Sequence, residues 1–225
     1  MRQLINLKAY VFPPSALKGD FTMQLVYNLI ILIISYLLGS INTSIIVSKI
    51  MIGDDIRNHG SGNAGATNTL RTVGKLGALL VVLGDVLKTV IAILVARLIS
   101  PDTAQATYIA GIGTVLGHNF PLYFKFKGGK GIIVSTVAML FADPIIGLVV
   151  AVIAISIMAI SRYVSLGSVL GAALFVVLSL IFRNGNPDFV VFAIMLAVLA
   201  IYMHKSNIIR LANGTENKLS FGKKD

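Results

Sequence analysis

The sequence predicts an all-α integral membrane protein that crosses the bilayer about seven times. Apolar runs of about 20 residues, the length at which a helix spans a bilayer, recur along the chain. Hydrophobic residues make up 56% of the 225 residues and the mean hydropathy is +0.87, while charged residues make up only 12%. A soluble domain carries about twice that share of charge. Because lipid offers the backbone no hydrogen bonds, we expect these runs to be helices.

The apolar runs place seven spans along the chain, two of which are ambiguous. They lie at about 25–48, 78–99, 106–120, 131–142, 145–160, 166–182 and 189–204. The fourth and fifth are short, and the proline of Asp143-Pro144 separates them because it cannot continue a helix. They form either two tilted crossings or one re-entrant pair, and we favour seven crossings over five.

The N-terminal segment and the distribution of charge predict how the protein sits in the membrane. Residues 1–22 show little pattern and are predicted as an exposed extension before a single polytopic domain at 23–225. With the N-terminus outside, thirteen Lys and Arg residues fall in the inner loops and C-terminal tail, and five fall outside. This excess predicts a cytoplasmic C-terminus, since positive charge concentrates on that side. It also accounts for the net charge of +10, so nucleic-acid binding is not expected.

The composition excludes several kinds of chemistry. The chain contains no cysteine, which excludes disulfides, thiolate metal sites and cysteine nucleophiles. It contains three histidines, one glutamate and eight aspartates, so a carboxylate-rich metal site is not expected.

The stretch "GSGNAGATNTLRTVGK", residues 60–75, is polar and rich in glycine although apolar runs flank it. It contains the letters of the dinucleotide fingerprint G-x-G-x-x-G, but no strand precedes it and no βαβ unit surrounds it, so dinucleotide binding is excluded. Glycines still let backbone N–H groups converge on an anion, and a helix beginning at about Ala66 or Thr67 adds its positive end. We therefore predict a phosphate-binding loop at Gly60–Asn68, called the cradle below. A turn that only caps a helix is the alternative.

Side chains in and after the cradle also favour anions. Neutral donors come from Ser61, Asn63, Thr67 and Asn68. If residues 67–75 form one helix, Asn68, Arg71 and Lys75 share a face, because they lie three and four positions apart.

The segment "GDVLK" places Asp85 and Lys88 three residues apart inside a predicted span, where they can pair. An ionisable group in a span costs about 3 kcal/mol on insertion scales, so such groups usually face a polar interior. Two interpretations stay open. The pair locks helices together, or Asp85 is an acceptor that orients the donors of the cradle.

The segment "GHNFPLYFKFKGGKG" ends a span at His118-Asn119 and continues into three lysines. It is not a nucleotide P-loop, because Gly131 stands where Ser or Thr binds magnesium. Lys125 and Lys127 alternate with aromatic residues and are interpreted as interfacial anchors. Lys130 has glycines on both sides, which leave room for a phosphate.

The segment "HKSNIIRLANGTE" places His204, Asn207 and Arg210 at helical spacing as the last span ends. All the polar clusters thus fall on one side of the membrane, and all favour anions. They predict at least two bound phosphate groups at the cytoplasmic interface. An organic-phosphate transporter with Asp85 and Lys88 along its pathway is a rival, although no internal symmetry supports it. A lipid-binding scaffold without catalysis is a weaker one.

Six segments of the chain form a recognisable set across about residues 24–218: "YLLGSINTS", "DDIRNHGSGNAGATNTLRTVGK", "GDVLK", "GHNFPLYFKFKGGKG", "RYVSLGS" and "HKSNIIRLANGTE". In this order they resemble the conserved segments of the bacterial acyl-phosphate:glycerol-3-phosphate acyltransferases, the PlsY family. Asn42 departs from the family pattern, because it stands where proline is usual after Gly-Ser-Ile. The bend that this proline implies near Ser40 is therefore open.

The resemblance implies an enzyme that transfers a fatty acyl group from acyl phosphate to the first hydroxyl of glycerol 3-phosphate, giving lysophosphatidic acid and inorganic phosphate. It implies no cofactor, no metal and no covalent acyl-enzyme. It also implies a multi-pass protein of the bacterial inner membrane, with its active site on the cytoplasmic side. The acyl-phosphate-producing enzyme is the implied partner for substrate hand-over.

The resemblance also assigns residues to the two substrates. The acyl-phosphate head group is expected at Ser61, Gly62, Asn63, Gly65, Thr67, Asn68 and Lys130. Glycerol 3-phosphate is expected near Arg71, Lys130, Ser168, His204 and Asn207. Lys130, His204 and Asn207 are the expected catalytic residues, with His204 and Asn207 orienting the groups while a substrate phosphate takes the proton; His204 as general base is the alternative. Supporting roles are expected for Asp85, Lys88, His118, Gly128, Gly129 and Arg210.

Overall fold

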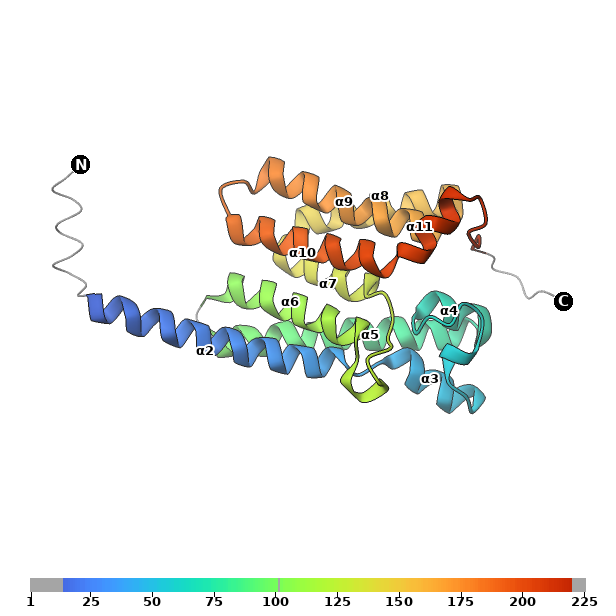
Figure 1. Ribbon diagram of the computed structural model, residues 1–225, viewed down its shortest axis with the longest axis horizontal. Helices are drawn as coiled ribbons and strands as arrows, with labels where there is room; N and C mark the ends of the chain where they lie inside the picture. The colour runs from blue at the N-terminus through green and yellow to red at the C-terminus, as the bar shows by residue number, and fades with distance from the viewer. Residues whose placement is uncertain (1–13, 101, 220–225) are drawn as a thin grey trace.

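The structure, a computed structural model, describes residues 14–100 and 102–219, and its secondary structure is entirely helical within these ranges (Figure 1). The α-helices are α2 (Pro14–Gly39), α3 (Thr43–Ile52), α4 (Ala66–Thr72), α5 (Lys75–Ile99), α6 (Thr103–Asn119), α7 (Ile132–Ala142), α8 (Pro144–Ser161), α9 (Val164–Phe182), α10 (Pro187–Met203) and α11 (Lys205–Ala212). Two 3₁₀ helices, η1 (Ile56–Asn58) and η2 (Leu122–Phe124), lie in the loops. The all-helical prediction is confirmed.

Several of these helices have the length and composition of membrane spans. Within the described chain, four segments are long and apolar enough to cross a membrane: Phe21–Ile52, Lys75–Ile99, Pro144–Ser161 and Val164–Phe182. A fifth is counted when α10 and α11, which meet at 63°, are taken as one broken span. α6 and α7 are shorter, with 17 and 11 residues. The protein therefore has the character of an integral membrane protein, while seven crossings stay a prediction.

The first predicted span, 25–48, consists of two helices. α2 begins at Pro14, so residues 14–22 of the predicted extension are helical, and the residues before them lie outside the described chain. α2 ends at Gly39 and α3 begins after Asn42.

Asn42 makes the break between α2 and α3. Its side-chain oxygen accepts a hydrogen bond from the backbone N–H of Ile45 at 3.1 Å, which is the bond of a helix N-cap. The chain is thus interrupted near Ser40 without a proline, because an asparagine can begin a new helix at the same place.

Buried polar side chains hold this break against α5 and α6. Nζ of Lys88 donates to the carbonyl oxygen of Ile41 at 3.0 Å and lies 2.8 Å from the Asp85 carboxylate. The same nitrogen lies 2.9 Å from Nδ1 of His118. Within the described chain, the side chains that contact the Asp85 carboxylate are those of Thr43, Lys88 and His118. The contacts therefore support the helix-locking role of the ion pair and not the orientation of cradle donors by Asp85.

Close packing of small and aromatic residues also joins the helices. α6 approaches α2 so closely that a Cβ at Gly117 would lie 2.2 Å from the carbonyl oxygen of Tyr36. Between α6, α9 and α10, four aromatic rings contact one another: Tyr108, Phe175, Phe189 and Phe192. These contacts give the bundle a rigid frame on which the loops rest.

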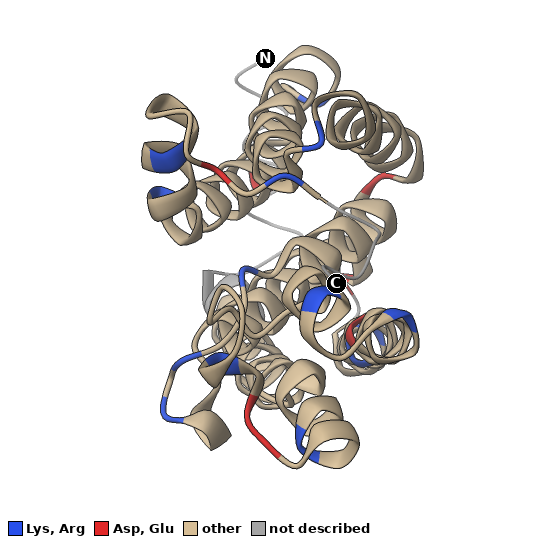
Figure 2. Ribbon diagram, turned by 90° about the vertical axis from the view of Figure 1, so that its right-hand side faces the viewer, with Lys and Arg blue, Asp and Glu red and all other residues tan. Residues whose placement is uncertain are grey.

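The long helices run along the long axis of the molecule, and the polar loops gather at one of its ends (Figure 1). α3, α4 and α11 lie at this end, on the right in Figure 1, while α2 begins at the opposite end. Figure 2 views the molecule from the loop end and shows Lys and Arg segments in both halves of the picture. The segments predicted to bind anions are thus neighbours in space.

Candidate active site

A cavity of about 770 Å³ lies between these loops and extends among the helices. Its volume is typical of a small-molecule site. All the residues predicted to bind substrate line it: Ser61, Gly62, Asn63, Gly65, Thr67, Asn68, Arg71, Lys130, Ser168, His204 and Asn207. Of the predicted supporting residues, Asp85, His118, Gly128 and Arg210 line it, whereas Lys88 and Gly129 lie behind its wall. The structure therefore brings together four segments that are distant in the sequence.

The side chain of Asn68 holds the backbone of the cradle by hydrogen bonds. Its side chain is buried, and its oxygen accepts a hydrogen bond from the backbone N–H of Ser61 at 2.9 Å. Its amide nitrogen donates to the carbonyl oxygens of Ile56 at 3.2 Å and His59 at 2.9 Å. Gly60, with φ of +57°, leaves room for this amide, since a Cβ there would lie 2.3 Å from its oxygen. Asn68 therefore fixes the loop, and its amide is not a free donor for phosphate.

Other side chains of the cradle do present free donors. The side chains of Ser61, Asn63 and Thr67 line the cavity and make no hydrogen bond within the described chain. Helix α4 begins at Ala66 as predicted, but it ends at Thr72 after seven residues. Such a short helix adds little dipole, so the capacity to bind an anion rests mainly on these side chains.

Arg71 adds a cation to the cradle from the last turn of α4. Its guanidinium is exposed, and Nη2 donates a long hydrogen bond of 3.5 Å to the carbonyl oxygen of Lys218. Lys75 does not share its face, because α4 ends at Thr72 and Lys75 begins α5.

The loop Lys125–Gly131, called the lysine loop below, packs directly against the cradle. A Cβ at Gly129 would lie 2.4 Å from the carbonyl oxygen of Ala64 and 2.2 Å from Nε2 of His118. Only glycine allows this approach of backbone to backbone. Gly129 thus has a packing role behind the cavity wall, which brings the next residue, Lys130, to the cavity.

Lys130 connects the lysine loop to α11. Its ammonium donates a hydrogen bond to the side-chain oxygen of Asn207. Burial lowers the pKa of Lys130 to about 8; the positive charges of Arg210 and Arg71 act in the same direction, and Glu216 opposes them. Lys130 is therefore still mostly charged at pH 7, and its ammonium has a neutral acceptor, Asn207, as its hydrogen-bond partner.

His204 lies at the junction of α10 and α11 and is held in one orientation. Its Nδ1 lies 2.7 Å from the carbonyl oxygen of Ala200. A carbonyl oxygen only accepts, so Nδ1 carries the proton and donates it there. In the neutral ring Nε2 is then an acceptor, available to a hydroxyl group.

Glu216, which the sequence reasoning did not single out, is part of the same network. Its carboxylate accepts hydrogen bonds from Asn207 at 2.6 Å, Ser165 at 2.9 Å and Arg210 at 2.8 Å. Burial disfavours its charge, but these hydrogen bonds outweigh burial and keep the pKa of Glu216 below its usual value. Arg210 thus binds this carboxylate through Nε at the edge of the cavity. The one available hint was that Glu216 is the only glutamate of the chain.

The cavity changes character away from the polar loops. There it is lined by apolar side chains of α7, α8 and α9: Val137, Leu140, Val150, Ala154, Met158 and Ala172 belong to this part. One continuous space thus joins cations and neutral donors to an apolar wall. An amphiphile with an anionic head group and a hydrocarbon chain fits this combination of surfaces.

The fold and the cavity define a helical membrane protein with a site for an anionic, lipid-like molecule. A family model described as glycerol-3-phosphate acyltransferase matches residues 29–214. The chain is 46% identical over 193 residues to the glycerol-3-phosphate acyltransferase of Thermoanaerobacter sp. (strain X514), covering 86% of this chain and 96% of that protein. It is 45% identical to the one of Clostridioides difficile (strain 630), over 88% and 98% of the two chains.

Solved structures agree with these relatives. The crystal structure of PlsY (YgiH), an integral membrane glycerol 3-phosphate acyltransferase, in its glycerol 3-phosphate form has a TM-score of 0.78 and 35% sequence identity, covering 86% of this chain and 96% of that one. The lysophosphatidic acid form has a TM-score of 0.76 and 33% identity over the same shares. The chain belongs to the glycerol-3-phosphate acyltransferase family, and the sequence-based recognition of the PlsY family is confirmed.

Proposed function

We propose that this protein transfers a fatty acyl group from acyl phosphate to the sn-1 hydroxyl of glycerol 3-phosphate, giving lysophosphatidic acid and inorganic phosphate. Acyl transfer to glycerol 3-phosphate is the activity of the family to which it belongs. The observation that carries the proposal is the single cavity in which anion-binding side chains meet an apolar wall. Both substrates need the polar part, and the acyl chain needs the apolar part.

The head group of the acyl phosphate is placed in the cradle, against the free donors of Ser61, Asn63 and Thr67. The acyl chain then extends along α7, α8 and α9. Glycerol 3-phosphate is placed on the opposite wall, between Arg71 and the α11 network, where Lys130 lies between the two phosphates. This arrangement uses Arg71 and Lys130, which form no ion pair with a carboxylate within the described chain, and leaves Arg210 with Glu216.

In the proposed reaction, the sn-1 hydroxyl oxygen attacks the carbonyl carbon of the acyl phosphate. The bond between that carbon and the phosphate oxygen breaks, and phosphate leaves with the electron pair. The hydroxyl proton passes to a phosphate oxygen, while Nε2 of His204 accepts a hydrogen bond from the hydroxyl and orients it. Lys130 offsets the charge that develops on the leaving phosphate. An acyl phosphate is already activated, so positioning supplies most of the catalysis and no acyl-enzyme is required.

The proposal includes a topology. We place seven crossings in the inner membrane of a bacterium, through α2–α3, α5, α6, α7, α8, α9 and α10, with the active site and C-terminus in the cytoplasm. The excess of Lys and Arg at the loop end of the bundle supports this orientation (Figure 2). Hand-over of acyl phosphate by the enzyme that makes it is part of the same proposal.

Because the chain contains no cysteine, the topology can be tested with single introduced cysteines and no native cysteine has to be removed first. Single cysteines at Gly185, between α9 and α10, and at Asn213, after α11, provide the two reporters. In intact cells a membrane-impermeant maleimide should label the Gly185→Cys variant only. Labelling of Asn213→Cys instead, or of both, contradicts the proposed orientation.

The activity itself is tested with the purified protein in detergent. Glycerol 3-phosphate is supplied with palmitoyl phosphate or with palmitoyl-CoA, each with and without EDTA, and lysophosphatidic acid is measured. Product should form with palmitoyl phosphate in both conditions. Robust product from palmitoyl-CoA alone, or loss of activity in EDTA, contradicts the proposed donor or the proposed metal-free mechanism.

A further inference from the structure

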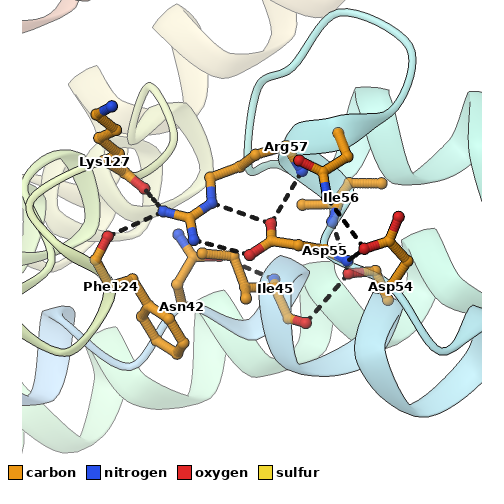
Figure 3. Close-up of polar contacts among 10 residues, drawn as sticks. Asn42, Ile45, Asp54, Asp55, Ile56, Arg57, Phe124 and Lys127 are labelled. Carbon is orange, nitrogen blue, oxygen red and sulfur yellow. Dashed lines mark hydrogen bonds and ion pairs between the residues drawn. The ribbon is translucent and has the colours of Figure 1, made fainter.

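Arg57 joins the segment before the cradle to the lysine loop (Figure 3). Two of its guanidinium nitrogens bind the Asp55 carboxylate, Nε at 3.0 Å and Nη2 at 2.7 Å. The third, Nη1, donates to the carbonyl oxygen of Phe124 and to that of Lys127, both at 2.9 Å. All three nitrogens are therefore used within the protein, and the Asp55 carboxylate raises the pKa of Arg57 by hydrogen bonding.

The two carbonyl groups that Arg57 binds enclose a strained turn. Between them lie Lys125 and Phe126, whose φ angles of +58° and +56° place both in the left-handed region. Residues with a side chain rarely adopt this conformation, because it brings Cβ too close to the following carbonyl oxygen. The turn persists only when surrounding contacts hold it, and the bonds from Nη1 to its two ends are such contacts.

The strained turn leads directly into the glycines that position Lys130. The lysine loop contacts the cradle itself at Gly129, which packs against the carbonyl oxygen of Ala64. The position of Arg57 is fixed by its neighbour in the segment before the cradle. It follows Ile56, which is fully buried and whose backbone N–H donates to the hydroxyl of Ser48 on α3 at 2.9 Å.

We propose that Arg57 is a positioning residue that sets the lysine loop, and with it Lys130, in register with the cradle by holding the Lys125–Phe126 turn. It touches neither substrate. Its function is to fix the separation between the head-group donors of the cradle and the ammonium that serves both phosphates. A misplacement of about 1 Å between reacting groups can cost about 100-fold in rate. This inference rests on the proposed function, and product formation by the unmodified protein tests that function separately.

The test begins with Arg57→Gln and Arg57→Lys. Neither side chain reproduces the planar fork that binds one carboxylate and two carbonyl groups at once. We expect kcat/KM for glycerol 3-phosphate to fall about 10- to 100-fold in both, with kcat falling as well as KM rising. Arg57→Lys keeps the positive charge, so near-normal activity in this variant shows that only charge is needed and overturns the proposal.

The matched control is Lys127→Ala. Its exposed side chain is lost, but its carbonyl oxygen, which Arg57 binds, stays in place. Arg57, Lys125 and Lys127 also line a second cavity of about 480 Å³, so a direct anion-binding role is the rival reading. We expect kcat/KM within about twofold of the unmodified protein, because this variant removes one exposed charge and keeps the hydrogen bond from Arg57 to the backbone of the loop. A loss equal to that of Arg57→Gln overturns the positioning role.

The decisive variant is Phe126→Gly in the Arg57→Gln background. Glycine adopts a positive φ without strain, so a turn that no longer needs to be held should recover. We expect the double variant to regain about tenfold in kcat/KM over Arg57→Gln, while Phe126→Gly alone stays near normal. If Arg57→Gln does not insert, Arg57→Lys with Phe126→Gly gives the same comparison. Absence of rescue in a folded double variant overturns the proposal.

Discussion

Lys130, in the loop before α7, donates a hydrogen bond to the side-chain oxygen of Asn207 on α11. The amide nitrogen of Asn207 donates in turn to Glu216 at 2.6 Å. The lysine thus reaches across the cavity to a helix 77 positions away in the chain. A substrate phosphate that enters between these residues replaces a neutral acceptor by a charged one, and charge-assisted bonds are about twice as strong.

The first prediction follows for substitutions of Lys130. Lys130→Ala should lower kcat/KM for glycerol 3-phosphate about 100-fold or more, because one cation that serves both phosphates is lost. Lys130→Arg should keep a measurable part of the activity, because the charge remains. It should not keep all of it, because the planar guanidinium needs a differently shaped space. Steady-state kinetics with both substrates varied provide the measurement. A change of less than about twofold in Lys130→Ala removes this residue from the site.

The second prediction concerns pH. In the free protein Lys130 has a pKa of about 8, lowered mainly by burial, so it is charged below this value and neutral above it. The kcat/KM for glycerol 3-phosphate should therefore be nearly flat between pH 6.5 and 7.5 and fall above about pH 8, by up to tenfold per unit. Bound phosphate raises the lysine pKa, so kcat should hold to higher pH. The alkaline fall should disappear in Lys130→Arg, and its persistence there assigns it to another group.

The third prediction separates two roles of His204. Because Nδ1 is held by the carbonyl oxygen of Ala200, Nε2 is the ring nitrogen left to bind a substrate in the proposed reaction. His204→Ala should be severe, with a loss of about 100-fold in kcat. His204→Asn should keep activity well above that of His204→Ala if the ring only orients the hydroxyl. Equal loss in both variants, together with a rate that falls as His204 is protonated, identifies the ring as the general base.

The fourth prediction separates Ser61 from Asn68, which the sequence placed in one class. Ser61→Ala removes a free hydroxyl and should lower turnover by about one to two decades with unchanged thermal stability. Asn68→Ala leaves the backbone N–H of Ser61 without its partner and removes one of the two donors to the carbonyl oxygens of Ile56 and His59, so it should also lower the stability by about 2 kcal/mol. Thermal unfolding in detergent beside the kinetics checks both. Equal stability of the two variants contradicts the role of Asn68 beneath the cradle.

The helices and most of the residues that line the cavity could be predicted from the sequence, and there is a physical reason for this. Hydrophobic length and the positions of polar clusters are local properties of the chain, so the helical class and the residues that line the cavity could be predicted. Side-chain partners depend on contacts between distant segments. For that reason the sequence did not predict three contacts: the hydrogen bonds of Asn68 to the cradle backbone, the contact of Lys88 with His118, and the bonds of Arg57 to Asp55 and the lysine loop. Glu216 lies in a polar tail without periodicity, so no pattern marked it.

The last prediction concerns Glu216, which holds Ser165, Asn207 and Arg210 together. Glu216→Gln keeps the shape but removes the charge, and we expect a loss of about 1.5–3 kcal/mol in stability at pH 7 together with a higher KM for glycerol 3-phosphate. The folded pKa lies below the ordinary value of 4.5, so the charge stabilises the fold above that pH, and its contribution is lost as the pH falls through the folded pKa. The difference between variant and unmodified protein should therefore shrink on acidification. Asp188→Asn, an exposed acid in the first turn of α10 at the opposite end, controls for net charge and should change neither property. A Glu216→Gln protein with unchanged melting temperature and KM contradicts the view that this carboxylate places Asn207 for catalysis.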